Sequence, residues 1–223
     1  MLFLFFEKYK CIFVTNSRCW SKTMIKWTSK IHNINENLTH KMISKRKDVC
    51  LNYLGCNELK KYADNYFIYF MVRNPYERFL SVIKAHHRFE NKTFLEVIKE
   101  HKNKKIPYTY INPRSRILLN GKNVEILYFD NFRENFKNIC KKHNFPFEPE
   151  GVKEYNRIDV TDKDFNGKKI YDLQLSTFNF DNMPKYQYFY NQEIIDIVYS
   201  FFKDDFELFK FNKNIGNLKP RIH

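Results

Sequence analysis

The sequence predicts an α/β fold: a three-layer α/β/α domain with a central parallel sheet. Apolar runs rich in aromatic and β-branched residues alternate with segments whose apolar residues recur at helical spacing. Strands that alternate with helices form such a sheet, with helices on both of its faces. The chain has 223 residues, of which 43% are hydrophobic, so it can bury a core of its own. We therefore expect a single domain over residues 1–223.

The formal net charge is +14 and the isoelectric point is about 9.4. This balance favours polyanionic partners such as nucleic acid, anionic glycans, phosphorylated cofactors or acidic membranes. However, the lysines are spread along the chain, and the wealth of Lys, Asn, Ile, Phe and Tyr is typical of an AT-rich genome. The charge alone therefore points to no specific partner. The five cysteines form no C-x-x-C pair, which predicts free thiols and a cytoplasmic protein.

The first predicted strand is Cys11–Thr15, and the first predicted helix is Ser21–Ile31. Residues 1–6 are also apolar, but charged residues follow at once. We interpret this run as too short for a membrane span or a signal-peptide core. The polar turn between the strand and the helix is where α/β folds generally bind phosphate.

The second predicted strand, Tyr66–Val72, ends at Arg73. Asn74 is a good N-cap, Pro75 suits the first helical position, and Glu77 completes a capping box. Arg73 is therefore expected beside the positive end of a helix, which favours an anion. In that helix Arg78 and Ser81 are three residues apart and share a face, so Ser81 can add a neutral donor.

The stretch Arg73–Ser81, RNPYERFLS, resembles the 3′-phosphate-binding motif of sulfotransferases that use 3′-phosphoadenosine 5′-phosphosulfate (PAPS). It is most similar to the carbohydrate sulfotransferase branch. The resemblance implies that Arg73 and Ser81 bind the 3′-phosphate of the nucleotide. It also implies a P-loop NTPase-like sulfotransferase fold.

The stretch 16–23, NSRCWSKT, resembles the loop that binds the 5′-phosphosulfate in the same family. The resemblance assigns Arg18, Ser21, Lys22 and Thr23 to that group, with Arg18 as the catalytic residue. Arg18 stands where the family has a lysine, and arginine is the poorer proton donor. Trp20 and Ser21 stand where the family has small residues that let the backbone approach the phosphate. Nucleotide binding is therefore expected to survive better than catalytic power.

The remaining elements follow in order. We expect short helical structure at Asn57–Ala63, and a capping box at Thr93–Glu96 that opens a helix to about His101. Val124–Phe129 is a further strand, and a capping box at Asn131–Glu134 opens a helix to about His143. Loops are expected to dominate from Pro146 to Met183. The apolar residues of 194–202 predict a final helix, and the basic tail from about residue 213 is expected to be mobile.

The general base stays open among His40, His86, His87 and none of these. The stretch 107–116, PYTYINPRSR, resembles the acceptor-side segment of the family, but Tyr110 stands in place of its histidine and Arg114 in place of its glutamine. The segment from Tyr190 to Phe211 also resembles the end of carbohydrate sulfotransferases, in its Tyr-Asn start and its Asp-Phe-x-Leu-Phe pattern.

The resulting hypothesis is an enzyme that transfers a sulfuryl group from PAPS to a hydroxyl, most simply on a carbohydrate. It needs no metal and binds no nucleic acid. Its acceptor and oligomeric state are left open, as is peripheral contact with membranes. One alternative is a weak or inactive protein on the same fold that binds nucleotides or polyanions. Another is a P-loop-like kinase that uses ATP, for which the glycines of the phosphate loop are missing.

Overall fold

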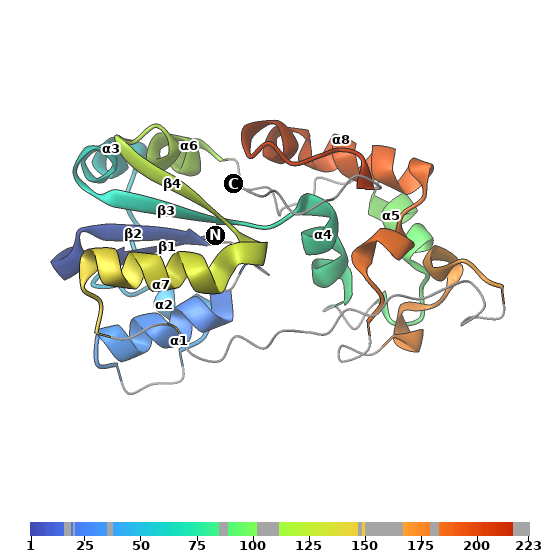
Figure 1. The fold of residues 1–223 in the computed structure, drawn as a ribbon, viewed down its shortest axis with the longest axis horizontal. Helices are drawn as coiled ribbons and strands as arrows, with labels where there is room; N and C mark the ends of the chain where they lie inside the picture. Colours follow the sequence, from blue (N-terminus) through green and yellow to red (C-terminus); the bar gives the residue numbers. More distant parts are fainter. Residues whose placement is uncertain are drawn as a thin grey trace. The chain divides into compact units, whose positions relative to one another are not determined.

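The computed structural model describes residues 1–15, 19, 21–34, 38–84, 89–101, 112–146, 149, 167–178 and 183–215 (Figure 1). These residues form two compact units. The first takes the described residues of 1–73 and 110–152, and the second takes those of 74–109 and 153–223. The architecture is α/β, as expected, whereas a single domain over the whole chain stays a prediction.

The first unit is built on a four-stranded sheet in the order β1 (Leu2–Phe6), β2 (Cys11–Thr15), β3 (Phe67–Val72) and β4 (Asn123–Tyr128). Strands β2, β3 and β4 are parallel to their neighbours, but β1 is antiparallel to β2. The sheet is therefore mixed: the predicted parallel arrangement holds for β2, β3 and β4, and β1 departs from it. The physical reason is the four-residue connection Glu7–Lys10, which is a 3₁₀ turn closed by Lys10 at φ 51°. So short a connection joins antiparallel neighbours only.

Helices cover both faces of this sheet (Figure 1). One face carries α1 (Ser21–Ile31), α2 (His40–Ile43) and α7 (Phe132–His143), and the other carries α3 (Cys56–Asn65) and α6 (Pro113–Leu119). The rings of Phe13, Trp27 and Phe136 meet beneath α1 and α7. The first unit thus has three layers.

The regular elements described in the second unit are helices and 3₁₀ turns, joined by loops and by one isolated β-bridge between Thr93 and Gln174. This unit contains α4 (Pro75–Lys84), α5 (Phe94–His101) and α8 (Gln192–Leu208), with short 3₁₀ turns at Ile170–Asp172, Leu175–Thr177 and Tyr186–Phe189. Helix α8 packs against both α4 and α5. Its backbone is non-helical at Phe202, where the helix kinks. The ring of Phe202 lies 5.7 Å from that of Phe79 in the core of this unit.

Two of the predicted helix starts are confirmed, namely the N-cap at Asn74 and the capping box at Thr93, whereas the part of Glu77 in a box at Asn74 stays a prediction. Asn74 Oδ1 accepts a hydrogen bond from the backbone N–H of Tyr76 at 3.0 Å. The capping box at Thr93 has both of its bonds, because Thr93 Oγ1 accepts from Glu96 N–H and the Glu96 carboxylate accepts from Thr93 N–H.

The capping box predicted at Asn131 was wrong, because the Asn131 side chain makes no capping bond. A 3₁₀ turn at Phe129–Asn131 precedes α7, so the backbone is already turning when the helix begins. Helix α6 was not predicted. Asn112 caps it by accepting from Ser115 N–H at 3.0 Å, with Pro113 in the first turn.

The start of the C-terminal tail is packed on the second unit. The hydroxyl of Tyr76 donates to the Lys213 carbonyl at 2.8 Å, and Ile215 is 7% exposed. The mobile tail expected from about residue 213 is therefore not found in residues 213–215, and residues 216–223 lie outside the described ranges.

All five cysteines are free. Within the described ranges, no helix combines the length and the apolar character that crossing a membrane requires.

Candidate anion-binding site at the carboxyl edge of the sheet

Three strands of the first unit end at one edge of the sheet. Because β2, β3 and β4 are parallel and in register, with Val14 beside Phe70 and Val72 beside Tyr128, their carboxyl ends share this edge. Ligands of open α/β sheets bind outside the carboxyl ends of the strands. The chain leaves these strands at Thr15, Arg73 and Phe129, and both stretches of the sequence that resemble nucleotide-binding motifs begin here.

The loop after β2 is closed by a side chain. The hydroxyl of Thr15 donates to the backbone carbonyl of Cys19, and both residues are fully buried. Helix α1 then begins at Ser21, so its free N–H groups lie near the same edge. Ser21 and Thr23 are half-buried, and Lys22 is exposed. Arg18 lies outside the described residues.

Arg73 is 6% exposed, although it carries a full charge. Its guanidinium carbon lies 4.1 Å from the centroid of the Phe129 ring, within the range of a cation–π contact. Arg73 follows β3 and Phe129 follows β4, so the pairing of these two strands brings the two side chains together. The ring supports the guanidinium in a desolvated position and fixes its plane.

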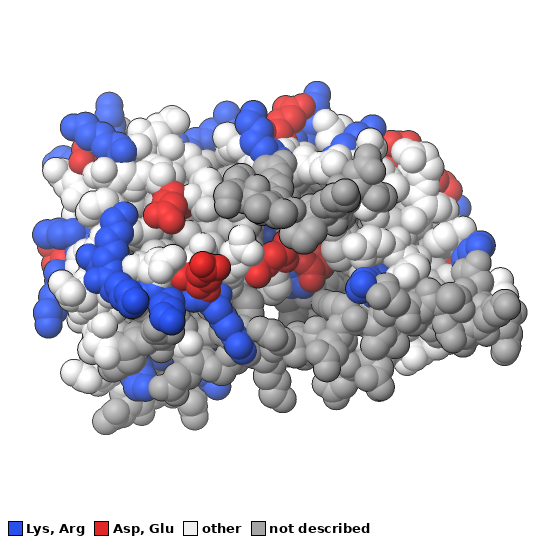
Figure 2. Space-filling model, in the orientation of Figure 1, with Lys and Arg blue, Asp and Glu red and all other residues white. Residues whose placement is uncertain are grey.

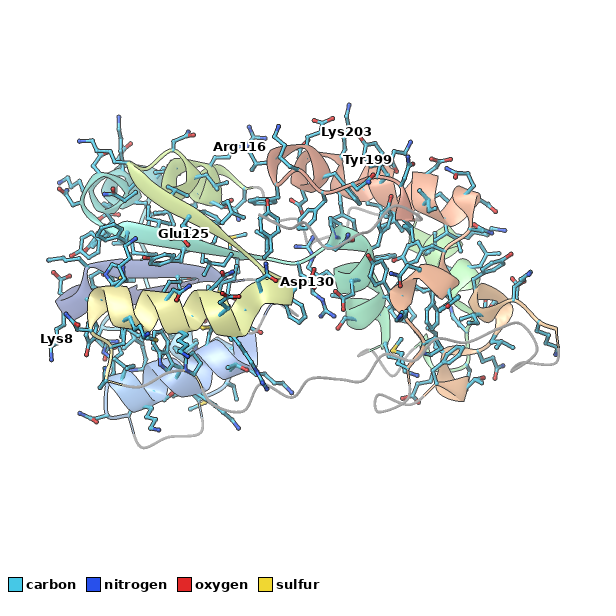
Figure 3. All side chains as sticks on the ribbon, viewed as in Figure 1. Lys8, Arg116, Glu125, Asp130, Tyr199 and Lys203 are labelled. Carbon is cyan, nitrogen blue, oxygen red and sulfur yellow. The ribbon has the colours of Figure 1, made fainter. Side chains whose placement is uncertain are left out.

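Acidic charge is also present at this edge. Asp130 follows Phe129 in the 3₁₀ turn, and Figure 3 shows it at the end of β4 where α7 begins. It is exposed, in contrast to Arg73. Glu125, in the middle of β4, lies well away from this end (Figure 3).

Ser81 is half-buried on α4. It belongs to the second unit, whereas Arg73 is the last residue of its segment of the first unit. The shared role that the resemblance implies for Arg73 and Ser81 therefore stays a prediction.

Arg78 has a structural role within the second unit. It is 1% exposed, and its guanidinium pairs with the carboxylate of Asp205 on α8 at 2.8 Å. It also lies over the ring of Phe202, 5.1 Å from the centroid. Arg78 and Ser81 therefore differ in their surroundings: Arg78 is buried in the core, whereas Ser81 is half-buried.

Two of the segments that carry the resemblance make contact inside the second unit. Tyr190 donates through its hydroxyl to the Tyr76 carbonyl at 2.7 Å, and the Tyr76 ring lies 4.8 Å from that of Phe206. Asp205 and Phe206 belong to the Asp-Phe-x-Leu-Phe pattern, and Tyr76 and Arg78 belong to the Arg73–Ser81 motif. Part of the resemblance therefore reflects packing. The sequence contained a signal for the buried Arg78–Asp205 pair, since Asp205 interrupts the apolar face of its helix.

The predicted histidines are dispersed. His40 is exposed at the start of α2, and desolvation lowers its pKa. His86 and His87 lie outside the described residues. The sequence analysis missed His143, whose Nε2 lies 2.7 Å from the Tyr69 hydroxyl and whose pKa is lowered by burial and by Lys142. It belongs to the end of α7, away from the carboxyl edge. In the described part of the chain, no three His, Cys, Asp or Glu side chains are grouped to hold a metal ion.

Comparisons with models of protein families, with curated proteins and with solved structures find no match for this chain.

Proposed function

We propose that this chain is a cytoplasmic PAPS-dependent sulfotransferase that moves a sulfuryl group to a hydroxyl, in the first instance on a carbohydrate. Arg73 and Ser81 hold the 3′-phosphate of the donor. Arg18, Ser21, Lys22 and Thr23 hold its 5′-phosphosulfate, and Arg18 stabilises the leaving phosphate. The five free cysteines support a reducing compartment.

The observation that carries this proposal is the setting of Arg73. A guanidinium at the carboxyl end of β3, stacked on Phe129 and followed by a capped helix, suits bidentate contact with a phosphate. Strand β3 is the direct neighbour of β2, after which the second motif-like loop begins. Phosphate groups bound at these two positions are what a nucleotide phosphorylated on both its 3′ and 5′ sides would supply.

The position of Arg73 also weighs against the ATP-dependent kinase. A P-loop kinase needs glycines in the phosphate loop and an acidic residue that holds magnesium. Residues 16–23 contain no glycine. Strand β3, the parallel neighbour of β2, is followed by Arg73. Asp130 follows β4, which lies one strand further away.

The loop after β2 supports a second candidate, a binder with weak or no activity. Arg18 replaces lysine, and Trp20 occupies a position where the family has a small residue. These changes affect the contacts to the departing 5′-phosphate, whereas Arg73 is unchanged. Such a protein would bind the nucleotide and transfer sulfate slowly or not at all.

Two measurements test the proposal. Calorimetry compares adenosine 3′,5′-bisphosphate with ATP, and we expect tighter binding of the bisphosphate. A preference for ATP would end the PAPS proposal. Transfer of label from PAPS to a panel of glycans then separates the enzyme from the inactive binder, because both bind the bisphosphate but only the enzyme gives a labelled product.

A further inference from the structure

The positive charge of the chain is divided unequally between the two units. The segments of the first unit contain 20 Lys and Arg against 10 Asp and Glu, and those of the second contain 19 against 15. The net charges are therefore +10 and +4. Since the two units hold nearly equal numbers of cations, a general bias towards lysine does not explain the difference. The first unit is more positive because it has fewer acidic residues than the second.

Two helices of the first unit carry basic residues at a spacing of four. Lys22, Lys26 and Lys30 do so on α1, and Arg133, Lys137 and Lys141 do so on α7. All six side chains are exposed. Residues four apart in a helix lie on one side of it, about 6 Å apart along the axis. Each helix therefore presents a row of three cations to solvent.

The two rows belong to one face of the first unit. Helices α1 and α7 pack on the same side of the sheet, and the rings of Trp27 and Phe136 lie 5.4 Å apart between them. These rings point inward, so the basic rows face away from the core. Figure 2 shows basic side chains gathered over the part of the first unit where α7 lies in Figure 1. We call the six residues of these two rows the α1–α7 basic face.

Three lysines of this face differ in their surroundings from three lysines of the second unit. In the second unit, Lys92 pairs with Glu100, Lys99 lies 3.9 Å from Glu193, and Lys203 lies 3.8 Å from Glu207. The acid in each pair cancels much of the field of its lysine.

Lys26, Lys137 and Lys141 form no ion pair with an acid among the described residues. Their field therefore extends into solvent and is available to an external anion.

We propose that the α1–α7 basic face binds a bilayer that contains anionic phospholipids. Five of its six cations are lysines, which act as hydrated point charges and suit a diffuse anionic surface. Proteins that read nucleic acids use arginine forks and exposed aromatic rings. The aromatic residues of α1 and α7, which are Trp27, Phe132 and Phe136, are all buried. The face therefore attracts by charge, without inserting apolar side chains.

The test is co-sedimentation of the full chain with phospholipid vesicles, either of phosphatidylcholine alone or with about 30% phosphatidylserine. The test variant changes Lys26, Lys137 and Lys141 to Gln. The control variant changes Lys92, Lys99 and Lys203 to Gln, which removes the same charge from the second unit. Circular dichroism and a urea midpoint establish that both variants fold. Lys22 stays unchanged because it belongs to the proposed nucleotide loop.

We expect binding only to vesicles with phosphatidylserine, and weaker binding at high salt. Each lysine near an anionic surface contributes about fivefold to partitioning, so the test variant should bind about 100-fold more weakly. The control variant should lose much less. Equal losses in the two variants would overturn the proposal, because net charge alone would then explain binding. So would binding to double- or single-stranded DNA without binding to the vesicles.

Discussion

The guanidinium of Arg78 and the carboxylate of Asp205 lie 2.8 Å apart with side-chain exposures of 1% and 0%. They are 127 residues apart in sequence and connect α4 to α8 in the core of the second unit. Two opposite charges at this depth depend on each other, because each lacks the water that would otherwise solvate it.

Replacing either Arg78 or Asp205 alone should therefore destabilise the protein strongly. We expect Arg78→Met or Asp205→Leu to lower the free energy of unfolding by about 3–5 kcal/mol, because a buried charge loses its ion-pair partner. The double variant should recover most of this loss. Urea unfolding of the four proteins measures the coupling. Asp196→Asn is the control, since its partner Lys213 lies 3.3 Å away at the surface, and it should lower the free energy of unfolding far less than either core variant. Additive losses in the double variant would contradict this account.

The proposed phosphate contact of Arg73 can be measured directly. Arg73→Ala should weaken binding of adenosine 3′,5′-bisphosphate by about 100-fold or more, and Arg73→Lys should lie between, because it keeps the charge but loses the fork. Ser81→Ala should have a smaller effect, since a neutral hydrogen bond contributes about 1 kcal/mol. Calorimetry gives the affinities. Arg114→Ala is the control, as its guanidinium donates to the Leu54 carbonyl within the first unit. Unchanged affinity in Arg73→Ala would remove the assignment.

Phe129 should act by holding Arg73 in place. We expect Phe129→Leu to reduce the affinity for adenosine 3′,5′-bisphosphate about fivefold, because a desolvated cation–π contact contributes about 1 kcal/mol, and Phe129→Tyr to retain it. The informative quantity is the ratio of this affinity to that for adenosine 5′-monophosphate. General loosening of the site weakens both ligands, whereas misplacement of Arg73 affects only the ligand with the 3′-phosphate. A ratio that stays constant would assign Phe129 to packing alone.

Gly121 should not tolerate a side chain. A Cβ atom there would lie 2.6 Å from the Ala63 carbonyl oxygen and 2.8 Å from Ile68 Cδ1. Gly121→Ala should therefore destabilise the chain by about 1–3 kcal/mol, because the turn before β4 must move away from the end of α3. At Gly55 the nearest atom is the flexible Glu58 carboxylate at 3.4 Å, so Gly55→Ala should change stability by less than about 1 kcal/mol. Thermal unfolding compares the two, and equal midpoints would be inconsistent with this packing.

His143 should make stability depend on pH. Burial, and next the charge of Lys142, lower its pKa below the ordinary value of 6.5. The unfolded chain therefore binds the proton more readily, and the free energy of unfolding falls as the pH drops from 6.5 towards the lower folded pKa. His32 and His40 have lowered pKa values too and add in the same direction. Urea midpoints between about pH 7.5 and 5.5 measure the slope, which His143→Gln should make shallower. An unchanged slope in His143→Gln would show that His143 does not contribute to the pH dependence of stability.

Local patterns predicted most of the elements, because buried strands and capped helices have local signals. The runs that became β2 and β3 are unbroken and apolar, and the cap at Asn74 is a property of adjacent residues. Strand β1 was missed because its pairing with β2 depends on the short turn after it. Helix α6 begins with an Asn-Pro pair, which is a helix-start signal, but we interpreted these residues as part of a family segment.

The site was predictable only in part. The place of Arg73 between a strand and a helix follows from its neighbours in sequence. Its contact with Phe129 depends on β4 lying beside β3, and such long-range pairing leaves no local mark. The partner of Arg78 was hidden for the same reason, although an aspartate on an apolar helix face is a signal that can be searched for.

Each unit is assembled from two separate stretches of chain, and the stretches alternate. No single cut in the gene therefore yields either unit alone. During synthesis, β1, β2 and β3 leave the ribosome long before β4 and α7, and α4 leaves it long before α8. The nascent protein must keep several aromatic-rich faces uncovered until α8 has been made. Expression should therefore respond to chaperone supply and to growth at low temperature.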